Sequence, residues 1–168
     1  MATATQQPSR GRWEVSSSES VEILLVEDSD SDAELTTHAL RKSKVANKIH
    51  RVRDGAEALD YLFCRADYQS RRFDAPPNLV LLDLKLPKVD GLQVLQAVKG
   101  DARTRAIPVI ILTSSKEERD LVNSYQTGVN SYIQKPVDFS AFQEVVRHLG
   151  LYWLLMNSKP PAAAFLAS

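Results

Sequence analysis

Short apolar runs alternate along this chain with longer amphipathic stretches. Four of the runs are near-continuous in apolar residues, and each stops at a polar residue. They are Val21–Val26, Leu79–Leu82, Pro108–Leu112 and Tyr132–Gln134. Runs of this length are typical of strands buried on both faces of a sheet. The stretches between them repeat apolar residues at helical spacing, so we expect parallel strands joined by helical crossovers.

The same patterns predict the remaining elements. A further strand is expected near Lys48–Arg53. The helices are expected at about Asp32–Ser43, from Asp54-Gly55 through Phe63, at Leu92–Lys99, at Glu117–Gln126 and from near Phe139. Asp30 or Ser31 is expected to cap the first helix. The polar stretch Arg65–Asn78 is expected to extend the second helix and then loop back.

The chain has 168 residues, room for one domain of ordinary size. Residues 1–20 are polar without apolar periodicity and read as a flexible tail. Residues 21–155 form the predicted domain. Residues 156–168 contain Lys159-Pro160-Pro161 and are expected to fray. We expect no second domain.

Composition excludes several classes of function. The 21 basic residues balance 21 acidic ones, so net charge does not predict a nucleic-acid or membrane partner. The single Cys64 cannot form an intrachain disulfide. No apolar segment resembles a secretion signal or reaches membrane-spanning length, so we expect a cytoplasmic protein.

The polar residues that end the four runs carry the candidate chemistry. They are Glu27-Asp28, Asp83, Thr113 and Lys135. Parallel strands place their carboxyl ends at one edge of the sheet, where open α/β folds bind ligands. Three acids at one edge suit Mg²⁺, which prefers oxygen ligands. Considered alone, Glu27-Asp28 is explained equally well by a cap on the first helix.

Asp83 strengthens the case for chemistry, because it is a carboxylate exposed at the end of a rigid strand. Such a group can attack phosphorus to give an aspartyl phosphate. The Thr113 hydroxyl and the Lys135 ammonium could each hold a phosphoryl oxygen. Tyr132 could turn inward once Thr113 moves toward that oxygen, although a rim tyrosine with a solvated hydroxyl explains it as well.

These residues occur in motifs that resemble a known family, the receiver domains of two-component response regulators. The resemblance covers Val21 to Leu155. Its motifs are Val26-Glu27-Asp28, Leu82-Asp83-Leu84-Lys85-Leu86-Pro87-Lys88-Val89-Asp90-Gly91, Leu112-Thr113-Ser114-Ser115 and Tyr132-Ile133-Gln134-Lys135-Pro136. Each motif is weak by itself, but their joint occurrence in this order is very specific.

The resemblance implies a flavodoxin-like, doubly wound α/β fold, with five parallel strands in the order 2-1-3-4-5 and five helices. It implies that Asp83 accepts a phosphoryl group from a histidine kinase. Asp28, Asp83 and the backbone carbonyl of Lys85 would bind Mg²⁺, with Glu27 acting through water.

The resemblance also implies that Thr113 and Lys135 bind the phosphoryl oxygens and that Tyr132 is the switch residue. A single-domain protein of this kind catalyses its own phosphorylation and dephosphorylation, and is not an enzyme acting on an external substrate.

More narrowly, the chain is similar to the stand-alone regulators that partner bacterial and cyanobacterial phytochromes. The Arg65–Asn78 insertion and the terminal Tyr152-Trp153-Leu154 carry this resemblance. It implies a phytochrome-type histidine kinase as the partner. Tyr152 and Trp153 are adjacent and cannot both point inward, so we expect one of them to meet a partner or a second copy in a homodimer.

Two other classes of function fit the sequence less well. Phosphatases with an aspartate nucleophile need a second acid two residues on, and Lys85 stands there instead. Nucleotide enzymes are disfavoured because neither a G-x-x-x-x-G-K-[ST] loop nor a G-x-G-x-x-G turn occurs. A receiver fold that acts as an interaction module without phosphorylation remains the alternative.

Overall fold

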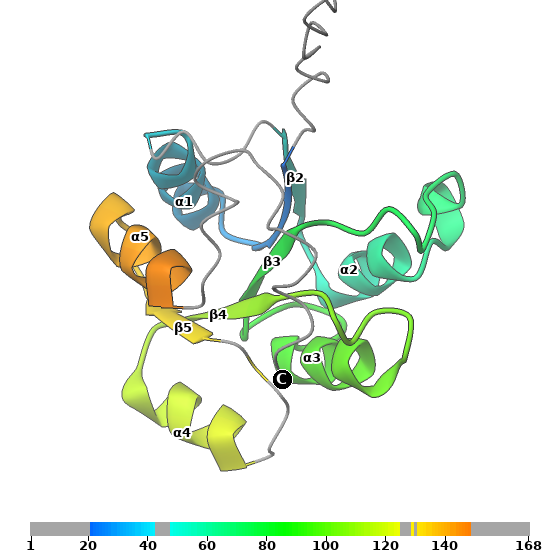
Figure 1. The fold of residues 1–168 in the computed structure, drawn as a ribbon. Helices are drawn as coiled ribbons and strands as arrows, with labels where there is room; N and C mark the ends of the chain where they lie inside the picture. Colours follow the sequence, from blue (N-terminus) through cyan, green and yellow to red (C-terminus); the bar gives the residue numbers. More distant parts are fainter. Residues whose placement is uncertain (1–20, 43–47, 125–128, 130, 149–168) are drawn as a thin grey trace, which may run out of the picture.

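Five strands and five α-helices alternate in the computed structural model, which describes residues 21–42, 48–124, 129 and 131–148 (Figure 1). In chain order they are β1 Glu22–Val26, α1 Asp30–Lys42, β2 Lys48–Val52, α2 Gly55–Leu62, β3 Leu79–Asp83, α3 Gly91–Gly100, β4 Val109–Thr113, α4 Lys116–Ser124, β5 Ser131–Gln134 and α5 Phe139–His148. A short 3-10 helix, η1 Ala66–Tyr68, follows α2.

The strands form one parallel sheet in the order β2-β1-β3-β4-β5. This confirms the expected flavodoxin-like architecture. The register pairs Val26 with Leu82 and Asp83 with Leu112, so the strands end together at one edge. The predicted polar strand ends therefore share that edge.

Side chains of successive strand residues pack on opposite faces of the sheet. In β1, Ile23 and Leu25 belong to the core beneath α1 and α5, whereas Leu24 and Val26 belong to the core beneath α2, α3 and α4. The buried residues of β3 and β4 are apolar up to the last one, which is Asp83 in β3 and Thr113 in β4. Burial on both faces explains why these strands read as continuous apolar runs.

Two local predictions were wrong. The helix α1 begins at Asp30, and the Ser29 hydroxyl accepts a hydrogen bond from the Asp32 amide at 3.3 Å, so the cap lies before both predicted positions. The helix α2 ends at Leu62 instead of extending into the insertion. Cys64 and Ala66, with φ of 54° and 50°, adopt left-handed conformations that do not allow α2 to continue as a right-handed α-helix.

The insertion after α2 is anchored to strand β1. Arg71 forms an ion pair with Glu22 at 2.9 Å, and its guanidinium lies 3.7 Å from the centre of the Tyr61 ring. Tyr61 donates a hydrogen bond to the same Glu22 carboxylate. Burial raises the pKa of Glu22, but the bonds from Tyr61, Lys48 and Arg71 outweigh it and leave this pKa below its ordinary value.

A Glu22→Gln substitution is expected to lower the free energy of unfolding by about 1–2 kcal/mol at pH 7, because charge-assisted hydrogen bonds are lost. A depressed carboxylate pKa stabilises the fold above the ordinary value of 4.5, and this stabilisation is lost as the pH falls below it. The difference between variant and wild type should therefore shrink toward pH 3 in urea unfolding. An equal difference at both pH values would contradict this origin; Glu34→Gln, at an exposed acid of α1, is the control.

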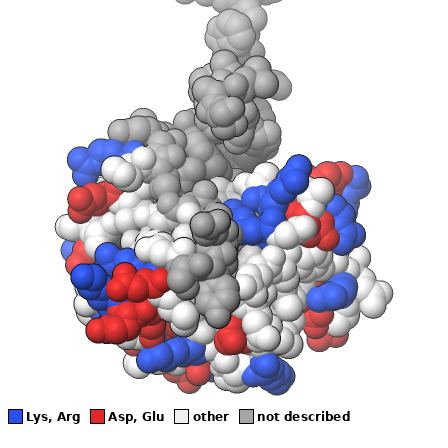
Figure 2. All heavy atoms as spheres, turned by 90° about the horizontal axis from the view of Figure 1, so that it is seen from below, with Lys and Arg blue, Asp and Glu red and all other residues white. Residues whose placement is uncertain are grey.

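The surface charge of the molecule and the length of its helices bear on whether it could contact or cross a membrane. Acidic and basic side chains are interspersed on the face of the molecule that Figure 2 shows. No helix in the described part of the chain is both long and apolar enough to cross a bilayer.

Candidate functional site

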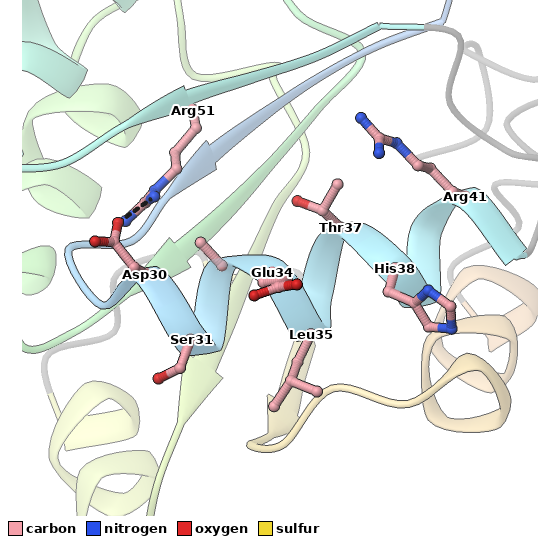
Figure 3. A pocket seen from close by; sticks show the side chains of 9 residues that line it. Asp30, Ser31, Glu34, Leu35, Thr37, His38, Arg41 and Arg51 are labelled. Carbon is pink, nitrogen blue, oxygen red and sulfur yellow. Dashed lines mark hydrogen bonds and ion pairs between the residues drawn. The ribbon is translucent and has the colours of Figure 1, made fainter.

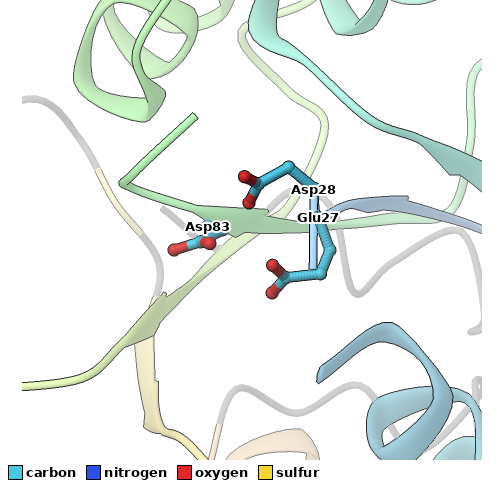
Figure 4. A group of neighbouring side chains, drawn as sticks. All are labelled: Glu27, Asp28 and Asp83. Carbon is cyan, nitrogen blue, oxygen red and sulfur yellow. The ribbon is translucent and has the colours of Figure 1, made fainter. Parts of the chain in front are cut away.

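Three carboxylates converge where β1 and β3 end (Figure 4). Glu27 and Asp28 follow β1, and Asp83 is the last residue of β3. One oxygen of each lies within 4.8 Å of the others. Glu27 and Asp83 are buried, whereas Asp28 is exposed, so the cluster opens to solvent on one side. A compact set of oxygen ligands with an open side suits Mg²⁺.

The buried acids repel one another. Burial raises the pKa of Glu27 to about 6, and the nearby charge of Asp83 adds to the rise against the opposing effect of Lys135. Glu27 therefore releases its proton less readily than an ordinary glutamate. A divalent cation would relieve the repulsion, so the donor set fits the metal.

Lys135 lies among the same acids. Its ammonium is 2.9 Å from Glu27 Oε2, 3.0 Å from Asp83 Oδ2 and 3.1 Å from Asp32 Oδ2. Burial lowers the pKa of Lys135, but the carboxylates outweigh it and raise this pKa well above its ordinary value. The side chain is therefore a permanent cation beside Asp83.

Thr113 ends β4 beside Lys135. The Lys135 amide donates to the Thr113 carbonyl at 2.7 Å, which fixes the two residues relative to each other. The Thr113 hydroxyl is buried and has no hydrogen-bond partner among the residues that the structure describes. An unpaired buried hydroxyl costs about 1–3 kcal/mol. A ligand oxygen at this edge would satisfy it.

Tight packing of α3 holds the backbone of Asp83 in place. A Cβ atom at Gly91 would lie 2.2 Å from the Asp83 carbonyl oxygen, so only glycine permits this approach. The Gly91 amide donates to the Leu84 carbonyl at 2.9 Å. Asp90 caps α3 in a capping box with Gln93. The turn after Asp83 is thus pinned at both ends.

The family profile described as "Response regulator receiver domain" matches residues 23–147. The chain belongs to this family. Receiver domains are signalling modules that bind a divalent metal at an acidic pocket and are phosphorylated by histidine kinases, and this chain has that pocket.

Several relatives support the assignment. The chain is 43% identical over 141 residues to the probable methanogenesis regulatory protein FilR2 of Methanothrix harundinacea, a match covering 84% of this chain and 88% of FilR2. Among solved structures, the bacteriophytochrome response regulator AtBRR is 54% identical, with a TM-score of 0.75 over 80% of this chain and 96% of AtBRR.

Two further solved relatives bear on the site. Rcp1 of Synechocystis is known in a Mn²⁺-bound form; it is 36% identical, with a TM-score of 0.66 over 83% of this chain and 99% of that one. The cyanobacterial phytochrome response regulator RcpA is known in phosphorylated form; it is 38% identical, with a TM-score of 0.67 over 86% of this chain and all of that one.

Tyr132 lies beside this receiver site but points toward α4. Its hydroxyl donates to the Asn123 side chain, and the Arg119 guanidinium lies 5.9 Å from its ring centre. Tyr152 and Trp153, predicted as a partner surface, lie outside the described residues. Of the predicted site residues, those at the strand ends are brought together and Tyr132 is adjacent to them.

Sequence reasoning missed three polar residues around the receiver site. Asp32 binds Lys135 from the first turn of α1. Glu118 of α4 pairs with Lys85 at 3.0 Å and also accepts from the Ser114 amide. Arg51 of β2 contacts the turn that carries Glu27 and Asp28. Only Asp32 had a sequence signal, since it lies at the start of the predicted first helix, shortly after Glu27 and Asp28.

Proposed function

We propose that this protein is a response regulator in which Asp83 accepts a phosphoryl group from the phosphohistidine of a histidine kinase. The proposal rests on two groups at the edge of the sheet where Asp83 lies: the Lys135 ammonium and the Thr113 hydroxyl. Lys135 Nζ lies 3.0 Å from Asp83 Oδ2, and the buried Thr113 hydroxyl at the same edge lacks a partner in the described structure. These are the two groups that would hold phosphoryl oxygens.

The transfer is a simple displacement. A carboxylate oxygen of Asp83 attacks phosphorus, a P–O bond forms, and the P–N bond to the kinase imidazole breaks. The imidazole nitrogen keeps the electron pair of that bond and takes up a proton from solvent. Lys135 then moves from Asp83 to a phosphoryl oxygen, and the Thr113 hydroxyl donates to another. The catalysis is that of the receiver on itself, and we propose no external substrate for turnover.

The proposed cofactor is Mg²⁺. Asp28, Asp83 and the carbonyl oxygen of Lys85 would hold it, and Glu27 would act through water. The bound ion would neutralise the charge that gathers as the phosphoryl group approaches the acids. The chain's own part is to present oxygen ligands on rigid strand ends, as the close approach of Gly91 to Asp83 ensures.

Tyr132 is the proposed switch residue. In the described structure its hydroxyl is engaged with Asn123 of α4. Rotation of the Thr113 side chain toward a phosphoryl oxygen would open space next to β5, and Tyr132 would leave Asn123 to occupy it. The face formed by α4, β5 and α5 would thereby change shape on phosphorylation.

The narrower assignment concerns partners. We propose a phytochrome-type histidine kinase, supported by the 54% identity to the bacteriophytochrome regulator AtBRR and by the anchored insertion after α2. We also propose a cytoplasmic homodimer with no nucleic-acid partner, and a domain running from residue 21 to residue 155. Tyr152 and Trp153 stay predictions for the dimer or kinase surface.

Intact mass spectrometry tests the proposed function directly. The full chain is incubated with Mg²⁺ and a small acyl phosphate, and peptide mapping locates any gain in mass. One phosphoryl group on the peptide containing Asp83, absent when EDTA is added, is the expected result. No gain while a known receiver reacts in parallel would overturn the proposal and favour an interaction module that works without phosphorylation.

A further inference from the structure

Arg51 contacts the acid-bearing turn through three different atoms. Its Nε donates to the Glu27 carbonyl at 3.0 Å, and its Nη2 donates to the Asp28 carbonyl at 3.3 Å. Its Nη1 pairs with Asp30 Oδ1 at 2.8 Å, the contact drawn as a dashed line in Figure 3. The side chain is only 24% exposed. One guanidinium thus holds positions 27, 28 and 30 beside the proposed metal site.

These contacts lie just beyond the end of β1, where hydrogen bonds to the neighbouring strands no longer fix the backbone. The Glu27 amide donates to the Val52 carbonyl at 3.1 Å, just beyond the last paired residues of β1 and β2. The carbonyls of Glu27 and Asp28 lie beyond that bond. The planar fork of an arginine can bond both at once, which a lysine ammonium on a flexible stem does less well.

We propose that Arg51 is a positioning residue for the metal site. It holds the peptide planes of Glu27 and Asp28, so that both carboxylates face Asp83 before the ion binds. This inference rests on the proposed function, because it assumes that these acids bind Mg²⁺. Arg51 reaches the acids through their main chain, so it shapes the site without being a ligand.

Charge and geometry predict opposite effects when Arg51 is replaced. The positive charge of Arg51 opposes a nearby divalent cation, so loss of charge alone would tighten Mg²⁺ binding. Loss of the two hydrogen bonds from Arg51 to the Glu27 and Asp28 carbonyls leaves the turn free to move and should weaken Mg²⁺ binding. Removal of residues that orient metal ligands usually lowers metal affinity by about tenfold or more. An Arg51→Lys variant keeps the charge and removes the fork, so it separates the two effects.

Arg53 provides a matched control. It pairs with the same Asp30 oxygen at 2.7 Å, and its side chain is 60% exposed. Replacing Arg53 by lysine or alanine makes the same chemical changes one residue beyond the end of the same strand. Exposed ion pairs contribute little, so these variants should bind Mg²⁺ within about twofold of wild type.

The experiment is calorimetric titration of the full chain with Mg²⁺, with unfolding in EDTA as a check that each variant is folded. Arg51→Lys should weaken Mg²⁺ binding by about tenfold, and Arg51→Ala should weaken it less, because the loss of charge opposes the loss of geometry. At saturating Mg²⁺ the rate of phosphorylation by an acyl phosphate should return to within about twofold of wild type, because Asp83, Thr113 and Lys135 are untouched. A merely structural defect would not be repaired by metal in this way.

Three outcomes would overturn the inference. Wild-type affinity in Arg51→Lys would show that the fork does not matter. Equal losses of Mg²⁺ affinity in the Arg51 and Arg53 variants would assign the effect to Asp30 or to general charge. A phosphorylation rate of the Arg51 variants that stays low at saturating Mg²⁺ would assign the effect to damage elsewhere in the site. If the wild-type chain itself bound no Mg²⁺, the proposed function would fail first and this inference with it.

Discussion

An Asp83→Asn variant is expected to gain no phosphoryl group under conditions in which the wild-type chain gains one. The amide of asparagine is a poor nucleophile toward phosphorus and carries no charge. The Lys135 ammonium, 3.0 Å from Asp83 Oδ2, would keep Glu27 and Asp32 as partners, so the site need not collapse. Intact mass after incubation with Mg²⁺ and an acyl phosphate measures the loss.

The stability of this variant separates loss of chemistry from loss of fold. Asp83 is only 4% exposed, and its charge helps to raise the pKa of Glu27, after the larger effect of burial. Removing that charge relieves repulsion, so the variant should unfold in EDTA at or slightly above the wild-type temperature. The rise in melting temperature that Mg²⁺ gives the wild type should be largely lost.

Asp90→Asn is the matched control for Asp83→Asn. It makes the same chemical change after the same strand, and asparagine caps a helix as well as aspartate does. This variant should be phosphorylated like the wild type. Stable phosphorylation of Asp83→Asn at another residue would contradict the assignment of the acceptor, whereas its failure to fold would leave the mapped phosphopeptide of the wild type to decide.

The strand ends could be predicted because a central strand buried on both faces requires apolar residues along its length. The run Leu79–Leu82 is apolar throughout, and the polar residue that follows it, Asp83, is the last residue of β3. The order of the strands followed only from the family resemblance. Periodicity shows that strands are parallel and buried, but it does not show which strands are neighbours.

Contacts that depend on register could not be predicted. Arg51 reaches Glu27 because β1 and β2 pair Val26 with Val52, and nothing local to Arg51 indicates that alignment. The start of α1 was misplaced for a different reason. Asp30 and Ser31 are both good capping residues, but Ser29 stands one position earlier and caps the helix first.

Lys135→Met is expected to be the most destabilising change at the site. The Lys135 side chain is 13% exposed and is the cation that Glu27, Asp32 and Asp83 share. Removing one partner of a buried ion pair typically costs about 3–5 kcal/mol. Protonation of Glu27 limits the cost, so we expect a loss of about 3 kcal/mol in the free energy of unfolding in EDTA near pH 7.5. Urea unfolding measures it.

The pH dependence follows from the sign of the Glu27 shift. Burial and the charge of Asp83 raise the pKa of Glu27 to about 6 even with Lys135 present, and loss of the ammonium raises it further. A carboxyl whose folded pKa is raised destabilises the fold as the pH rises from its ordinary value of 4.5 through the folded pKa. The deficit of Lys135→Met should therefore grow between pH 5 and pH 7.5.

Metal should repair the stability of Lys135→Met but not its chemistry. Mg²⁺ supplies the positive charge that the acids lose, so millimolar Mg²⁺ should restore most of the free energy of unfolding. Phosphorylation should stay about 10–100 times slower, because a charge-assisted bond of about 1.5–3 kcal/mol to the phosphoryl oxygen is missing. Lys88→Met, which removes an exposed lysine paired with Asp54 at 3.2 Å, is the control and should change neither property. A Lys135→Met chain as stable in EDTA as in Mg²⁺ would show that Lys135 is not the counterion of the metal-free site.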